Sequence, residues 1–234
     1  MYEISSSLGL GGDLIILSDA RLVAIVGLSL YVSLSATMVS CLLGMPLGAL
    51  MVVGRFPTRR PLIVVLNALM GLPPVVVGLL VYLLLSRAGP LGTFGLLFTP
   101  TAMIIAQTVL VTPIIAALSR QVIEVEWREY REQLQSLGAE RGRIALTLLW
   151  NARFPLTTVT LAGFGRAISE VGAVIIVGGN INGVTRVMTT TIALETSKGD
   201  LSLALALGAI LISIVLIINA AAEALKLWAE KRWG

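Results

Sequence analysis

The chain has 234 residues, of which 56% are hydrophobic and 13% charged, and its formal net charge is +4. Soluble domains are less apolar and carry about 25% charged residues. One soluble core of this size could not bury so much apolar surface, so the composition excludes an ordinary soluble enzyme and a disordered chain and indicates a membrane protein.

The residues that usually carry catalysis or bind metals are scarce. Histidine is absent and Cys41 is the only cysteine, which excludes a histidine-based site, an internal disulfide and a cysteine cluster for metal. No phosphate-binding Gly-x-x-x-x-Gly-Lys-Ser/Thr loop is present either. We therefore expect a chain that is not itself an enzyme and that holds no metal or cofactor.

Long runs nearly free of charge predict the membrane spans, because a helix needs about 20 apolar residues to cross a bilayer. They predict one all-α transmembrane domain over residues 1–234 with five spans, at Leu22–Val53, Pro61–Ser86, Leu97–Ser119, Phe154–Val177 and Leu201–Ala222. Within the first span, the spacing of Gly44 and Gly48 predicts a packing groove for a neighbouring helix. The shorter segment Leu8–Leu17 is expected to be an interfacial helix or loop on the outer face.

The positions of lysine and arginine predict the orientation, because these residues accumulate in cytoplasmic loops. Twelve of them fall in the loop after the first span, the loop between the third and fourth spans and the C-terminal tail, against four on the other side. We therefore expect the C-terminus in the cytoplasm and the N-terminus outside.

The loop at residues 120–153 is the most highly charged part of the chain, with nine charges in the 20 positions from Glu124 to Arg143. Apolar residues recur there at the spacing of one helical face: Ile123, Trp127, Tyr130, Leu134 and Leu137. Gly138 follows where a helix C-terminus would be, and a second short helix is predicted over Ala139–Leu149. The loop either only fixes topology or docks a soluble partner, and the two-helix pattern favours docking.

Two stretches resemble a known family. Glu132–Ala139 resembles the EAA loop of ABC importer permeases, since Glu132 and Gly138 keep the spacing of that motif, although Gln133 and Leu134 replace its alanines. Gly165–Ala173 and Val177–Asn180 resemble molybdate, sulfate and tungstate permeases, and Ile181–Glu195 looks most like the tungstate branch.

The resemblance implies a type I ABC importer permease (MetI-like) in the cytoplasmic membrane. Such a permease is a homodimer in contact with lipid and not with nucleic acid. It binds two copies of a cytoplasmic ATPase, which carries ATP and Mg, and it receives an oxyanion from an external binding protein. The implied ATPase-coupling residues are Glu132, Gln133, Ser136, Leu137, Gly138 and Ala139.

The resemblance favours tungstate as the substrate, and a molybdate or sulfate permease is the alternative. A self-sufficient secondary transporter is the second class considered. It would need a coupling-ion site and usually more spans, neither of which the sequence indicates.

Two charges lie inside the fourth predicted span, where a charged side chain is costly. Arg166 and Glu170 are four residues apart, so we expect them on one face of a helix. They are either a structural clamp between helices or a gate at which Arg166 attracts a dianion.

A turn-rich segment follows on the predicted outer face. Its glycines and hydroxyls could bind an oxyanion near the external gate, or the turn could simply satisfy its own backbone. The candidate residues are Gly178, Gly179, Asn180, Arg186, Thr189 and Thr190.

Overall fold

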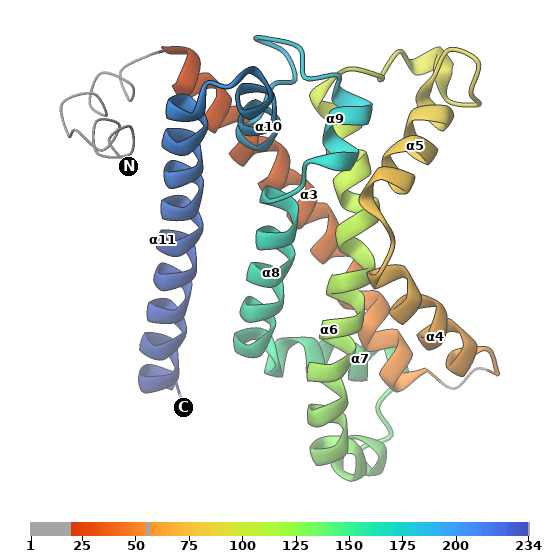
Figure 1. The fold of residues 1–234 in the computed structure, drawn as a ribbon. Coiled ribbons are helices and arrows are strands. Elements are labelled where there is room, and N and C mark those ends of the chain that lie inside the picture. The colour runs from red at the N-terminus through yellow and green to blue at the C-terminus, as the bar shows by residue number, and fades with distance from the viewer. Residues whose placement is uncertain (1–19, 55–56, 234) are drawn as a thin grey trace.

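The computed structural model describes residues 20–54 and 57–233, so the predicted segment Leu8–Leu17 lies outside the described residues. The described part is all-helical, as predicted (Figure 1). The elements are α3 (Ala20–Val53), α4 (Arg59–Met70), α5 (Pro74–Leu85), the 3-10 turn η1 (Gly92–Phe94), α6 (Pro100–Ser136), α7 (Arg141–Asn151), α8 (Arg153–Ile168), α9 (Gly172–Gly178), α10 (Met188–Lys198) and α11 (Leu201–Trp233).

Helices α3 and α6 pack closely along each other, and α3 runs obliquely behind the other helices (Figure 1). A Cβ atom on Gly48 would lie 2.7 Å from the carbonyl oxygen of Ala116, and one on Gly44 would lie 3.0 Å from that of Thr112. Only glycine allows so close an approach of the two backbones. The groove predicted from the glycine spacing is therefore confirmed.

The second predicted span is two helices rather than one. Helices α4 and α5 meet at a bend of 101°. The bend falls between Gly71 and Pro74, where two successive prolines lack backbone N–H groups and disfavour the helical conformation in the residue before them.

The fourth predicted span is also broken, and here no proline causes the break. Helix α8 ends at Ile168 and α9 begins at Gly172, with a bend of 57° between them. The side chain of Glu170 accepts a hydrogen bond from the Ala173 backbone N–H at 3.0 Å and so caps the start of α9. This break depends on a tertiary arrangement that hydropathy does not report.

The third predicted span continues without interruption into the charged loop at residues 120–153. Helix α6 begins at Pro100, where the Thr99 hydroxyl accepts a hydrogen bond from Ala102 N–H, and it runs for 37 residues to Ser136. The predicted amphipathic helix is therefore the lower part of α6. Figure 1 shows this end of α6 and α7 at the opposite end of the molecule from α9 and α10.

The last part of the chain contains one helix that the sequence does not predict. Residues Met188–Lys198 form α10, where the turn-rich outer segment is expected to continue. The fifth predicted span falls within α11, which is long and apolar enough to cross a membrane. This helix packs against α10 and α8, and its side chains up to residue 224 are otherwise largely exposed. Among the described residues, α3, α6 and α11 are long and apolar enough to cross a membrane, and the two bent pairs raise the number of spans to as many as five.

Candidate functional site

Arg166 and Glu170 form an ion pair at the break between α8 and α9, inside the fourth predicted span. Arg166 lies in the last turn of α8, whereas Glu170 lies beyond the end of that helix, so the expectation that both stand on one helix is wrong. The pair still forms because the chain continues to turn after Ile168, with Glu170 N–H donating to the carbonyl of Ala167 at 3.2 Å. The Glu170 side chain is 3% exposed and that of Arg166 is 31% exposed.

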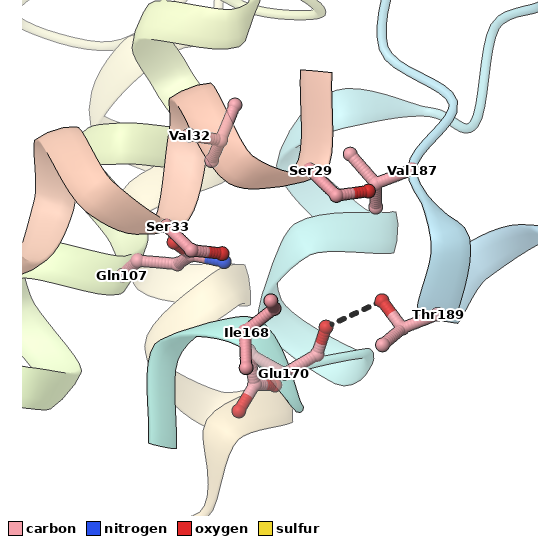
Figure 2. A pocket seen from close by; sticks show the side chains of 8 residues that line it. All are labelled: Ser29, Val32, Ser33, Gln107, Ile168, Glu170, Val187 and Thr189. Carbon is pink, nitrogen blue, oxygen red and sulfur yellow. Dashed lines mark hydrogen bonds between the residues drawn. The ribbon is translucent and has the colours of Figure 1, made fainter. Parts of the chain in front are cut away.

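Glu170 also connects three helices. One carboxylate oxygen accepts from Ala173 N–H at the start of α9, and the other pairs with Arg166 at the end of α8. Its backbone carbonyl accepts a hydrogen bond from the Thr189 hydroxyl of α10 at 2.9 Å, drawn as the dashed line in Figure 2. The cation and the amide satisfy the buried carboxylate, which would be costly to leave unpaired. The bond from Thr189 ties the α8–α9 break to α10.

The outward face of α8 differs from the exposed faces of the other long helices. Thr158, Ala162 and Ser169 are exposed on or just beyond α8, and a Cβ atom on Gly165 would meet nothing within 4 Å. The large apolar side chains of α8 are buried or half-buried, whereas α3, α5 and α11 expose many leucines and valines. Small and polar residues beside the partly exposed Arg166 suit contact with water or protein better than contact with lipid tails.

The predicted outer turn is confirmed as a turn. Gly178 ends α9, and the next positions take positive φ angles: 70° at Gly179, 51° at Asn180 and 75° at Gly183. Arg186 donates to the carbonyl of Asn180 at 3.4 Å, so these two candidate residues are brought together.

The threonine hydroxyls, by contrast, bind the protein's own backbone. Thr189 and Thr190 lie in the first turn of α10 and are buried, Thr190 completely. The Thr189 hydroxyl donates to Glu170 and that of Thr190 donates to Val187. In this conformation they tie α10 in place and do not present donors to an oxyanion.

The loop that is expected to contact an ATPase ends α6 in a well-defined turn. Gly138 has a φ of +64°, its N–H donates to Gln135 at 3.0 Å, and Ala139 N–H donates to Leu134 at 3.3 Å. These two bonds are the Schellman arrangement, so the predicted helix end at Gly138 is confirmed. The side chain of Leu137, just before the turn, is 80% exposed.

The rest of the loop is split between a packed face and an open one. Trp127 and Leu134, from the predicted apolar stripe, pack against a cluster that includes Val52 of α3 and Leu148 of α7. The remaining coupling candidates are half-buried or exposed: Glu132, Gln133, Ser136 and Ala139. This packing holds the open residues on a rigid support.

Charges on α6 above the turn are paired along the helix. Glu124 lies 2.8 Å from Arg120, one turn before it, and 3.5 Å from Arg128, one turn after it. Partial burial, and secondly the carboxylate of Glu129, raise the pKa of Glu126 above its usual value. Among the described residues, no group of three histidine, cysteine, aspartate or glutamate side chains could hold a metal ion.

The structure also brings together polar residues that were not singled out from the sequence. Ser29 and Ser33 of α3, Gln107 of α6 and Glu170 line a small buried pocket (Figure 2). A signal was present, because hydroxyl residues recur every four positions at Ser29, Ser33 and Thr37, and Gln107 interrupts an apolar run.

The long apolar helices, two bent helix pairs and a buried ion pair define a multi-pass membrane protein. Residues 42–234 match the family described as "Binding-protein-dependent transport system inner membrane component". The match covers most of the chain, which therefore belongs to that family: it is a permease subunit of an ABC transporter in the cytoplasmic membrane. ATP hydrolysis in such a transporter is performed by a separate ATPase subunit.

The most informative relatives carry transport names. The "Probable anion ABC transporter permease protein" of Haloferax volcanii is 44% identical over 85% of this chain and 88% of its own length. The tungstate uptake system permease of Peptoclostridium acidaminophilum is 42% identical over 89% of this chain and 91% of its own. The molybdenum transport system permease of Escherichia coli K12 is 31% identical over 85% and 94%.

We predict that the single variant Arg166→Ala is less stable than the double variant that carries both Arg166→Ala and Glu170→Gln. The single change leaves a buried carboxylate without its cation, which typically costs about 3–5 kcal/mol, whereas the neutral amide of the double variant needs no cation. The midpoint of thermal unfolding in detergent, measured for the wild type, both single variants and the double variant, gives the coupling. Strictly additive effects would contradict the clamp.

Proposed function

We propose that this permease imports tungstate in preference to molybdate or sulfate. The observation that carries the proposal is its greater identity to a tungstate uptake permease than to a molybdenum permease, with both relatives aligned over most of their lengths. A tetrahedral dianion also suits a membrane region whose partly exposed charge is the guanidinium of Arg166.

We propose five spans, with the N-terminus outside and the C-terminus in the cytoplasm. The excess of lysine and arginine in the loops between α3 and α4 and between α6 and α8 supports this orientation. Both loops and the far end of α11 lie at one end of the molecule, and the α9–α10 connection lies at the other (Figure 1).

For the assembly, we propose a homodimer of this single domain bound to two ATPases, which carry the ATP and Mg, and served by an external oxyanion-binding protein. The ATPase would contact residues 120–153 at Glu132, Gln133, Ser136, Leu137, Gly138 and Ala139. The exposed Leu137 at a rigid turn supports this assignment, because a docked apolar residue with firm backing makes an effective anchor. Helix α6 would then carry the ATPase movement directly into the membrane.

For the pathway, we propose that the open face of α8 lines an aqueous route and that Arg166 attracts the oxyanion there. Glu170 neutralises part of the Arg166 charge, so that the anion would bind weakly enough to leave again. The same carboxylate holds α8 and α9 together at the break. Gly178, Gly179, Asn180 and Arg186 would form the external gate, with Thr189 and Thr190 holding it to the break.

The substrate proposal predicts ATP-dependent tungstate uptake by proteoliposomes that contain the permease, its ATPase and the binding protein. Uptake of tungstate should exceed that of molybdate and sulfate at equal concentration, since the binding protein delivers the preferred oxyanion. Complexes without ATP serve as the control. Uptake driven by an ion gradient without ATP would instead support a secondary transporter, and faster molybdate or sulfate uptake would reassign the substrate.

The coupling proposal predicts that Gly138→Pro and Leu137→Asp each reduce ATPase association at least tenfold while the permease still inserts in the membrane. Proline cannot adopt the positive φ of Gly138, and aspartate places a charge where an apolar anchor is expected. Co-purification with the ATPase measures the effect. Thr147→Asp, at an exposed position on α7, is the matched control. Wild-type association of both variants would refute the assignment.

The pathway proposal predicts that a cysteine at Ala162 reacts with an anionic methanethiosulfonate reagent in membranes, because the reaction needs a hydrated thiolate. The background is Cys41→Ala, which removes the native thiol. Leu205→Cys, on a face of α11 that is also exposed in the isolated chain, should stay unlabelled because lipid covers it. Equal labelling of the two positions, or none at Ala162→Cys, would contradict an aqueous face on α8.

A further inference from the structure

A small pocket lies beside Glu170, between α3, α6, the end of α8 and the start of α10 (Figure 2). Ser33 of α3, Gln107 of α6, Glu170 and Thr189 are among the residues that line it. The side chains of Ser33, Gln107 and Glu170 are each only 3% exposed. The pocket therefore lies where α3, α6, the end of α8 and the start of α10 meet, and buried side chains line it.

Gln107 uses only half of its amide group. Its Nε2 donates to the carbonyl of Ala167, in the last turn of α8, at 3.0 Å. Its Oε1 is buried and has no hydrogen-bond partner in the described structure. A buried acceptor without a partner is unfavourable, so this atom needs a donor that the helices themselves do not supply.

The size of the pocket identifies the donor. The cavity measures about 10 Å³, which is close to the space that one water molecule needs. A water there can donate to Gln107 Oε1 and accept from the Ser33 hydroxyl, whereas an oxyanion is too large and has no proton to donate to Oε1. The chemistry and the volume both select a single water.

Gln107 also lies on the helix that enters the cytoplasmic loop. From Gln107 to the α6 turn at Leu137 is 30 residues, or about 45 Å of helix at 1.5 Å per residue. Helix α6 contains Pro113 but stays helical through it, so one helix still connects its cytoplasmic end to Gln107 and passes a displacement along. Through Ala167, the amide then acts on the turn of α8 that carries Arg166.

We propose that Gln107 is a positioning residue that transmits the movement of α6 to the α8–α9 break, with one water bound at its Oε1. The water gives the amide and the Ala167 carbonyl an exchangeable partner, so the hydrogen bond between α6 and α8 breaks and re-forms during transport without leaving either group unsatisfied. This role rests on the proposed ATP-driven import. The contact that would break and re-form is the hydrogen bond from Gln107 to the Ala167 carbonyl.

The test compares Gln107→Met with the wild type in the reconstituted transporter complex. Methionine keeps the length and volume of glutamine but removes both amide functions, including the unpartnered oxygen. We expect tungstate uptake to fall at least tenfold while ATP hydrolysis, complex assembly and thermal stability stay within about twofold or a few degrees of wild type. The control is Ser119→Ala, which should transport normally. It removes a different buried and unpartnered polar group of α6, a hydroxyl that lies away from the break.

Normal uptake by Gln107→Met would overturn the proposal. A parallel loss of uptake, ATP hydrolysis and folded protein would also overturn it, because a purely structural role produces that result. Hydrogen exchange on the wild-type complex tests the movement at the break independently. The backbone amides of residues 165–173 should exchange faster after vanadate trapping, whereas those of α5 should not change. Unchanged exchange in both regions would also overturn it. A wild type that imports no tungstate contradicts the proposed substrate, whereas the exchange experiment still decides the role of Gln107.

Discussion

The rest of the structure depends on how the buried carboxylate of Glu170 is satisfied. A bilayer gives a charged side chain and the free ends of a broken helix no water to bind, so both need partners within the protein. Glu170 meets these needs together, because one carboxylate binds Arg166 at the end of α8 and caps α9 through Ala173. Its carbonyl receives the Thr189 hydroxyl and so adds α10 to the same joint.

This joint connects to the turn at Gly138, at the opposite end of the molecule, through α6. The glycines of α3 allow α6 to pack against it at backbone distance, and α6 then runs without a break to the turn at Gly138. At its other end, Gln107 binds the last turn of α8. One helix therefore links the turn at Gly138 to the α8–α9 break.

Part of this arrangement can be predicted from local sequence patterns. The Gly44 and Gly48 spacing indicates a helix-packing groove, and the stripe ending at Leu137 followed by Gly138 indicates where α6 stops. Hydropathy does not predict the break at Ser169–Val171, because no proline or glycine pair marks it and the run stays apolar on both sides. The sequence analysis also did not predict α10, and it proposed the Thr189 and Thr190 hydroxyls as oxyanion donors. The structure shows these hydroxyls donating to backbone carbonyls of the protein itself.

The sequence by itself determined that this is a helical membrane protein with one highly charged loop, since composition, charge-free runs and helical periodicity are properties of the chain alone. Only the tertiary structure decided where α8 breaks from α9, which face of α8 is polar, and that Gln107 shares a small pocket with Ser33 and Glu170. Those features arise from residues far apart in the chain, whose polar groups must find one another because neither lipid nor the apolar core can satisfy them.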